Sequence, residues 1–413
     1  MTLLMRAEKI LQRINELALI SEDTACLTRR FGTKVFLEGS QKIFSWMQEA
    51  GLAARIDNVG NVRGRLEATN GSIKTFVIGS HMDTVNNAGK FDGPLGIIMA
   101  IDLVEQFNLN KETFPFNIEV VAFCDEEGVR FHTTFLGSKV LTGSFHKALL
   151  NKMDDKGISM GEVLKEMHCD VDRIDQDAIP SINWAGYLEI HIEQGPVLYE
   201  KDIPVAVVSG IAAQKRIALS FTGVAGHAGT VPMKMRQDAL AAASACILQI
   251  EGFASRNNNL VATVGMMEVH NAASNVIPGS VTCSLDIRSI DGTFLNISCN
   301  ELHDICLNTC RDRNIEFKWE LVQETEPVVC DRSLNDLMEK AIIKNDIPVE
   351  ILVSGAGHDG VQIAKVSPIC MLFVRCFKGI SHNPLENVEI KDIAAAITVS
   401  EDFIKQLSTF AGK

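Results

Sequence analysis

The feature that most constrains the fold is an alternation of apolar runs and helical stretches in the first half of the chain. Apolar runs at residues 75–79 and 118–124 flank a helical stretch at 94–107, and the second run is rich in β-branched side chains. This order predicts α/β layers built on a largely parallel sheet. A further strand is predicted at 186–194, where apolar and polar residues alternate.

A second pattern interrupts the first in the middle of the chain. Over residues 215–322 the sequence reads strand, helix, strand, strand, helix, strand, which is the order of a ferredoxin-like domain. The α/β pattern then resumes with a helix and two apolar strands. A chain of 413 residues is also longer than one core normally fills. We therefore predict a main domain at 1–211 and 328–413, with an inserted domain at 212–327.

Composition and charge exclude several classes of protein. No uninterrupted apolar stretch of about 18 residues occurs, so no membrane span is predicted. Residues 1–26 mix charged and apolar residues in the manner of an amphipathic helix and not of a signal peptide. Eleven scattered cysteines without a Cys-X-X-Cys pair indicate reduced thiols in a soluble, cytoplasmic protein. The formal net charge of −13 disfavours nucleic acids and acidic membranes as partners.

The ionisable residues of chemical interest follow the predicted strands, where an α/β sheet usually presents its active site. They are His81, Asp83, Asp92, the run Asp125-Glu126-Glu127, His191 and His382. Each has an ordinary explanation when taken alone, since an aspartate can cap a helix, acids can form a surface turn and a histidine can pack in a core. Together they form the mixed nitrogen and oxygen ligand set that suits two Zn²⁺, Mn²⁺ or Co²⁺ ions.

Seven motifs resemble those of one known family, in order and over nearly the whole chain. They are GSHMDT at 79–84, KFDG at 90–93, DEEGVRF at 125–131, LEIHIEQG at 188–195, AGHAGT at 225–230, SGAGHD at 354–359 and GISHNP at 379–384. The chain resembles the hydantoinase/carbamoylase branch of the M20 metallopeptidase family, which includes N-carbamoyl-L-amino-acid hydrolases, β-ureidopropionases and allantoate amidohydrolases. The resemblance implies a zinc-peptidase-like catalytic domain, with a mixed sheet flanked by helices, and an inserted ferredoxin-like α+β domain that serves as lid and dimerisation domain.

The resemblance also implies the ligands of two divalent metal ions per subunit. Asp92 would bridge the two ions. The remaining ligands would be His81 and His191 on one ion, and Glu127 and His382 on the other.

Glu126 is the general base implied by the same resemblance. Two divalent ions lower the pKa of a water that they share, and an adjacent carboxylate can take its proton and pass it to the leaving nitrogen. Asp83 lies on the same side of an extended segment as His81, so it can accept from the imidazole or orient the ring. Adjacent Glu126 and Glu127 would point to opposite faces of an ideal strand, so the backbone there should leave β geometry.

A carboxylated substrate needs a fixed cation, and the planar fork of arginine suits a carboxylate. The resemblance assigns this role to Arg288, although the sequence alone also allows a surface ion pair with Asp286 or Asp291. Asn275 also fits simple turn chemistry. By the resemblance, the other substrate-binding residues are Gln194, Asn275, Gly357 and His358. Arg216 and His270 are expected to be structural.

His227 lies in the AGHAGT motif, where flanking glycines permit close approach. The resemblance implies that His227 binds substrate in the active site of the partner subunit and stabilises the oxyanion, so that a homodimer has a catalytic purpose. Because the inserted domain would bind the carboxylate and the main domain the metals, we expect the domains to close about hinges near 210–214 and 325–330.

The predicted function is hydrolysis of the carbamoyl or ureido C–N bond of an N-carbamoyl-L-amino acid or allantoate by a metal-bridged hydroxide. A dipeptidase or N-acyl amino acid deacylase is the nearest alternative. It is disfavoured by His191, because peptidase members carry an acidic ligand in that role. A non-catalytic binding protein is disfavoured because every expected ligand and Glu126 are present.

Overall fold

The computed structural model describes residues 1–411, which divide into two compact units. One unit combines Met1–Ser209 with the chain that follows Cys330, and the other is Gly210–Val329, the region of the expected insertion. Each unit has its own hydrophobic core. Within residues 1–411, no helix is both long enough and apolar enough to cross a membrane.

A nine-stranded mixed sheet runs through the first unit. Its path is β1 (Ala53–Ile56), β2 (Val62–Leu66), β4 (Asn117–Phe123), β3 (Thr75–His81), β5 (Trp184–Ile192), β15 (Ile369–Val374), β6 (Val205–Ile211) and β13 (Val328–Val329), with β14 (Ile351–Ser354) paired to β6. The central strands β4, β3, β5 and β15 are parallel, and the pairs β1–β2, β2–β4, β15–β6 and β6–β13 are antiparallel. The α/β class and the mixed sheet predicted from the sequence are thus confirmed.

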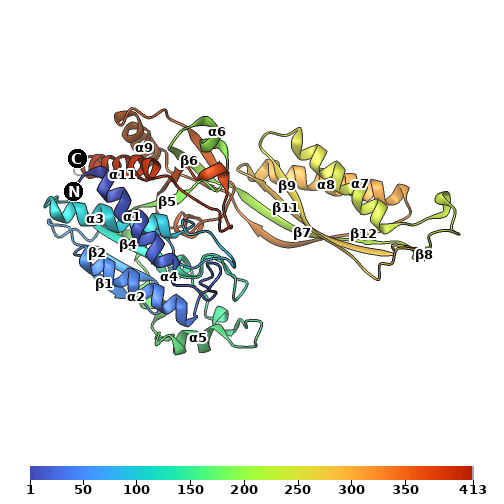
Figure 1. Cartoon of the computed structure of the whole chain (residues 1–413), viewed down its shortest axis with the longest axis horizontal. Helices are drawn as coiled ribbons and strands as arrows, with labels where there is room; N and C mark the ends of the chain where they lie inside the picture. The colour runs from blue at the N-terminus through green and yellow to red at the C-terminus, as the bar shows by residue number, and fades with distance from the viewer. Residues whose placement is uncertain (412–413) are drawn as a thin grey trace. The chain divides into compact units, whose positions relative to one another are not determined.

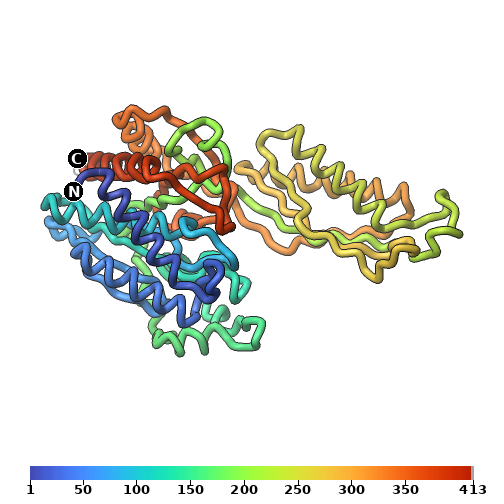
Figure 2. Tube along the Cα trace, in the orientation of Figure 1, coloured from blue at the N-terminus to red at the C-terminus, as the bar shows by residue number. Residues whose placement is uncertain are grey.

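The helices of the first unit are α1 (Leu3–Ala18), α2 (Lys34–Glu49), α3 (Pro94–Leu109), α4 (Leu136–Leu141), α5 (Met160–Glu166), α6 (Val197–Lys201), α9 (Arg332–Lys344), α10 (Gly360–Ile363) and α11 (Ile390–Ala411). The helix α2 packs against β1 and β2, α3 against β3 and β5, and α9 and α11 against β15. Figure 2 shows α1 lying beside α11, from the opposite end of the chain. Arg6 of α1 binds Asp102 of α3 and Glu401 of α11, so one side chain links three helices.

Both faces of β5 are buried. Leu188 and Ile190 join the hydrophobic core that contains α3, whereas Glu189 on the other face accepts a hydrogen bond from the backbone N–H of Gly360, where α10 begins. The alternation read from the sequence is therefore real, but its polar face is covered. Burial on both faces is typical of parallel strands between layers of helices, and it places His191 in the interior.

The second unit contains β7 (Ala213–Thr222), α7 (Ala239–Ser255), β9 (Val261–Val269), β11 (Ser280–Ser289), α8 (Gly292–Asp312) and β12 (Glu316–Thr325). The strands form an antiparallel sheet in the order β12-β7-β11-β9. Figure 1 shows α7 and α8 on the same face of this sheet. The β-α-β-β-α-β order predicted for this region is confirmed. A separate ribbon joins β8 (Gly226–His227) to β10 (Val276–Ile277).

Candidate metal centre and active site

The carboxyl ends of β3, β4, β5 and β15 meet at one edge of the sheet because these strands are parallel. In the pairing register, His81 lies opposite Phe123, and Ile192 lies opposite Val374. The ends of these strands and the segments that follow them therefore converge, and they carry the metal-ligand candidates.

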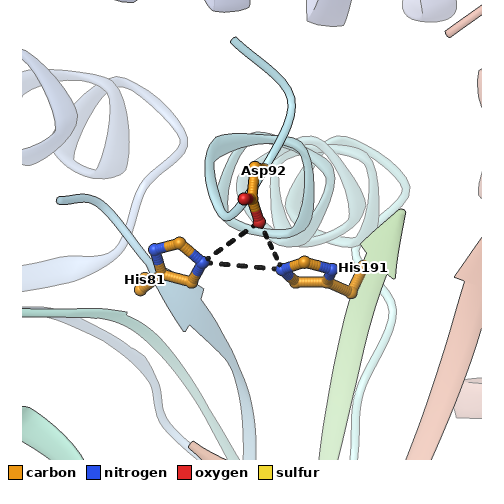
Figure 3. A group of neighbouring side chains, drawn as sticks. All are labelled: His81, Asp92 and His191. Atoms are coloured by element: carbon orange, nitrogen blue, oxygen red, sulfur yellow. Dashed lines mark hydrogen bonds and ion pairs between the residues drawn. The ribbon is translucent and has the colours of Figure 1, made fainter. Parts of the chain in front are cut away.

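His81, Asp92 and His191 form the most buried group at this edge (Figure 3). Nε2 of His81 lies 3.5 Å, and Nε2 of His191 3.1 Å, from Oδ1 of Asp92. Nδ1 of each ring faces a backbone carbonyl oxygen at 3.0 Å, that of Asp83 and that of Ile192. Because a carbonyl only accepts, Nδ1 of each ring carries a proton, and Nε2 of each ring faces Asp92. This donor set fits a divalent cation.

His382 and Glu127 form a second group on the other oxygen of Asp92. Nε2 of His382 lies 3.0 Å from Oδ2 of Asp92 and 3.5 Å from Oε1 of Glu127. Burial would raise the pKa of Asp92, but hydrogen bonds with the three histidines hold it well below its usual range. Asp92 therefore presents one oxygen to each group as a charged carboxylate, which is the arrangement of a ligand that bridges two ions.

Glu126 is buried beside these two groups. Burial raises the pKa of Glu126 well above its ordinary value, His81 opposes the shift, and Glu127 adds to it. Possible ligand atoms of His81, Glu126 and Glu127 also lie within 4.8 Å of one another. A buried carboxyl with a raised pKa next to a metal pocket is suited to accept and return a proton.

The carboxylate of Asp83 has a different partner from the one expected. It accepts hydrogen bonds from the backbone N–H groups of Glu126 and Glu127, at 3.1 and 3.2 Å. Its Oδ1 lies 4.0 Å from Nδ1 of His81, whereas the carbonyl oxygen of Asp83 lies 3.0 Å from that nitrogen. The two N–H groups belong to the loop after β4, where they have no partner in a neighbouring strand. The carboxylate of Asp83 therefore binds these groups and not the imidazole of His81. Asp83 thus orients His81 through its backbone and holds the two glutamates through its side chain.

The backbone leaves regular geometry where the site residues begin. Strand β4 ends at Phe123, and Asp125 has φ 49°, so the departure predicted next to the two glutamates is confirmed. Gln194 and His382 also have positive φ, 58° and 52°. Such conformations cost free energy in residues other than glycine and persist only where the surrounding structure enforces them.

One contributor to the site, Glu386, carried no recognisable signal in the sequence. Glu386 is buried and accepts hydrogen bonds from the backbone N–H groups of Phe91 and Asp92, at 2.7 and 3.1 Å, and from the hydroxyl of Ser381 at 3.1 Å. Nε2 of Gln194 donates to Oδ2 of Asp92 at 3.2 Å and to Oγ of Ser381 at 3.1 Å. Gln194 and Ser381 lie in motifs quoted from the sequence, whereas Glu386 acts on backbone groups 294 and 295 positions earlier in the chain.

His358 lies directly behind the first metal-ligand group. Its ring centroid is 4.5 Å from that of His191, and its Nε2 lies 2.8 Å from the hydroxyl of Ser354. Burial lowers the pKa of His358 well below its ordinary value, so the ring is neutral. At Gly357 a Cβ would lie 2.9 Å from the ring of Phe135, so the loop passes close to that ring.

The remaining candidates, His227, Asn275 and Arg288, belong to the second unit. Arg288 binds Asp286 through two nitrogens, with Nε 2.7 Å from Oδ1 and Nη2 3.0 Å from Oδ2. The ion pair with Asp286 that the sequence allowed is therefore observed. Nε of Arg216 also lies 3.3 Å from Oδ2 of Asp286. Two guanidinium groups thus share one carboxylate.

Removal of divalent ions is expected to destabilise the protein more at high pH than at low pH. Burial and the nearby Asp92 raise the pKa of Glu127 from 4.5 to about 7. The pKa of this carboxyl is higher in the folded protein than in the unfolded chain. Its contribution to the free energy of unfolding is therefore fully present below the pKa of the unfolded chain, and it is lost as the pH rises through the pKa of the folded protein. Bound cations would offset this loss. The melting temperature of chelator-treated protein should fall between pH 5 and pH 8, and excess Mn²⁺ should raise it more at pH 8. Equal gains at both pH values would contradict the expectation.

The fold and the site together define a metal-dependent hydrolase: a mixed α/β sheet whose strand ends bring three histidines and several carboxylates around one shared aspartate. Comparison with known families supports this class. Residues 77–406 match the family described as Peptidase family M20/M25/M40, and the chain belongs to this family.

Individual relatives resemble the chain over nearly its whole length. It is 38% identical to allantoate deiminase 1 from Glycine max, over 97% of this chain and 89% of that protein. It is 36% identical to N-carbamoyl-L-amino acid amidohydrolase from Geobacillus stearothermophilus, over 98% and 99%. Among solved structures, a hydantoinase/carbamoylase family amidase from Burkholderia multivorans superimposes with a TM-score of 0.90 at 30% identity, covering 97% of this chain and 98% of that one.

Proposed function

We propose that this protein is a metal-dependent amidohydrolase that cleaves the carbamoyl or ureido C–N bond of an N-carbamoyl-L-amino acid or of allantoate. The relatives that match nearly the full length carry the names of these two activities. The observation that carries the proposal is the placement of His191, a nitrogen ligand, beside Asp92 and His81 at one metal pocket. Peptidases that resemble this chain place an acidic residue in that role, so His191 favours the ureido substrates over peptides.

Five side chains would hold the ions. His81 and His191 would bind one divalent ion, Glu127 and His382 the other, and Asp92 both. When bound, two such ions polarise the scissile carbonyl and lower the pKa of a water molecule. Zn²⁺, Mn²⁺ and Co²⁺ all suit the mixed nitrogen and oxygen donors.

The protein's own groups would then move the proton and position the substrate. Glu126 would take a proton from the attacking water and deliver it to the leaving nitrogen. The carboxylate of Asp83, which accepts from the backbone N–H of Glu126 at 3.1 Å, would hold the backbone of Glu126 in place. Gln194, Asn275, Gly357 and His358 would contact the substrate. His227 would donate to the oxygen that becomes negatively charged during the reaction.

Arg288 would bind the substrate carboxylate, and its replacement by glutamine is expected to raise KM with little effect on kcat. Asp286 holds the guanidinium through two hydrogen bonds, and Arg216 binds the same carboxylate. Loss of a charge-assisted hydrogen bond of about 1.5–3 kcal/mol corresponds to a KM increase of about 10- to 100-fold. The control is a substrate whose carboxylate is replaced by a primary amide, on which wild type and variant should have similar kcat/KM. A variant that lost equal activity on both substrates would contradict this role.

The protein would act as a homodimer in the cytoplasm. Leu248 of α7 and Val261, Met266 and Met267 of the edge strand β9 are exposed, and an apolar edge strand is a surface that pairing with another chain can cover. All eleven cysteines are unpaired and most are buried, which suits a reducing compartment.

Mixing two inactive variants should restore activity if His227 serves the partner's active site. A heterodimer of Glu126→Gln and His227→Ala subunits would contain one site with both Glu126 and a partner's intact His227. Random exchange of subunits in this symmetric dimer should therefore return about a quarter of wild-type activity. Each variant alone is the control. Mixtures as inactive as the separate variants, with exchange demonstrated by differently tagged subunits, would place His227 in its own subunit's site or outside catalysis.

The proposal is tested by following ammonia and product release after reconstitution with Zn²⁺, Mn²⁺ or Co²⁺ separately. The substrates are N-carbamoyl-L-amino acids, N-carbamoyl-β-alanine, allantoate, N-acyl amino acids and dipeptides. Turnover of a ureido substrate would support the proposal and name the substrate. Activity restricted to dipeptides or acyl amino acids would favour a peptidase or deacylase, and inactivity with every metal would favour a binding protein.

A further inference from the structure

We propose that Glu386 is a positioning residue that sets the affinity of the metal pocket formed by Asp92, Glu127 and His382. The inference rests on the proposed metal centre and concerns a residue that itself touches neither a metal position nor the substrate. The side chain of Glu386 joins two loops that are far apart in the sequence.

The first loop lies directly before α3 and carries Asp92. Oε1 of Glu386 accepts from the backbone N–H groups of Phe91 at 2.7 Å and of Asp92 at 3.1 Å. The carboxyl group packs closely here, since a Cβ on Gly89 would lie 2.2 Å from its carbon. Glu386 is only 2% exposed, so these backbone groups have no water to replace a lost acceptor.

The second loop follows β15 and carries His382. The hydroxyl of Ser381 donates to Oε2 of Glu386 at 3.1 Å, and Oγ of Ser381 accepts from Nε2 of Gln194 at 3.1 Å. The same amide nitrogen donates to Oδ2 of Asp92 at 3.2 Å. The hydrogen bonds thus form a closed ring that runs from Glu386 to both loops and back through Asp92.

The two metal pockets depend on this ring to different degrees. His81 and His191 are almost fully buried, and the imidazole of each is oriented by a neighbouring backbone carbonyl. The side chain of His382 is 50% exposed, and its backbone has a positive φ that the loop must enforce. Loss of the Glu386 anchor should therefore release His382 much more than the other two histidines.

The test is the number and affinity of bound Mn²⁺ ions in wild type, Glu386→Ala and Glu386→Gln, measured by calorimetric titration and by elemental analysis after dialysis. Glutamine can still accept from the two N–H groups and donate to Ser381, so it should restore what alanine loses. We expect Glu386→Ala to bind one ion normally and the other about 10- to 100-fold more weakly, the usual effect of losing a partner that orients a ligand. Glu386→Gln should stay close to wild type.

Two further variants locate the effect. Glu193 likewise accepts from two backbone N–H groups, those of Val197 and Leu198 at 2.8 Å each, so Glu193→Ala is a matched control that should bind both ions normally. Adding Glu386→Ala to His382→Ala should cause no further loss of affinity, because both changes act on one pocket. If Glu386→Ala does not fold, Ser381→Ala keeps the bonds from Glu386 to the first loop, removes the hydroxyl that links Glu386 with Gln194, and should weaken the same ion.

Three outcomes would overturn the inference. They are unchanged affinity for both ions in the alanine variant, equal weakening of both ions, and a glutamine variant as defective as the alanine variant. The last result would assign the effect to the charge of Glu386 and not to its hydrogen bonds. A wild-type protein that binds no ions would instead refute the proposed metal centre itself.

Discussion

Replacing Glu126 with glutamine is expected to abolish turnover while both metal ions stay bound. Glutamine has the size of glutamate but cannot accept a proton, and proton transfer by a positioned side chain contributes about 10²- to 10⁴-fold to rate. The substitution keeps the backbone N–H that donates to Asp83, so the loop should hold its shape. The measurement is kcat on the best substrate, together with metal content and thermal unfolding.

The neighbouring Asp125 provides the matched control. Burial and the charge of Asp83 raise the pKa of Asp125 well above its ordinary value, so this carboxyl carries a proton that an asparagine amide can imitate. Asp125→Asn should therefore retain activity within a few-fold of wild type. A Glu126→Gln protein with normal kcat would exclude Glu126 as the base. If the Glu126→Gln protein had instead lost a metal ion, Glu126 would be a metal ligand. The closeness of Glu126 to His81 and Glu127 also allows this arrangement.

Replacing Asp92 with alanine is expected to remove both metal ions and all activity, a larger loss than any other single ligand would cause. Asp92 faces the two histidines of the first group with Oδ1 and His382 with Oδ2, so both pockets lose a charged ligand at once. By contrast, His382→Ala should lose one ion only. The readout is the ratio of bound Mn²⁺ to protein after dialysis, with folding checked by circular dichroism.

Asp102 is the matched control for this variant because it is also a buried aspartate, and it lies within α3, whereas Asp92 precedes this helix. Its carboxylate binds Arg6 and lies among structural contacts. Asp102→Asn should lower the melting temperature, since it leaves a buried guanidinium with a weaker partner, and it should bind both ions as wild type does. If the Asp92 variant kept one ion, the shared-carboxylate arrangement would be wrong. If it kept both, the metal centre would have to lie elsewhere.

Local sequence patterns predicted much of the architecture. The apolar run at 118–124 became β4, and the stretch at 94–107 became α3, because strand and helix periods are legible over a few residues. The same local patterns predicted that His81 and His191 lie at the ends of strands. The roles of Asp83 and Glu386 were not predicted in this way, because each depends on backbone N–H groups supplied by a distant loop.

The inserted unit illustrates the same limit. Its order of strands and helices followed from the sequence, and so did the two possible partners of Arg288. The geometry of β11 decided between them, because Asp286 and Arg288 lie on the same face of this strand, and the register of β7 against β11 then brings Arg216 to the same carboxylate.

The sequence by itself determined the order of the elements, the residue types at the strand ends and the family to which they point. These are properties of short segments, in which side-chain period and turn chemistry act locally. The tertiary structure alone decided which atoms meet: the two oxygens of Asp92 with two separate groups of candidate metal ligands, and Glu386 with residues 294 and 295 positions earlier. Such contacts arise when parallel strands bring distant loops to one edge of the sheet, and no local pattern encodes them.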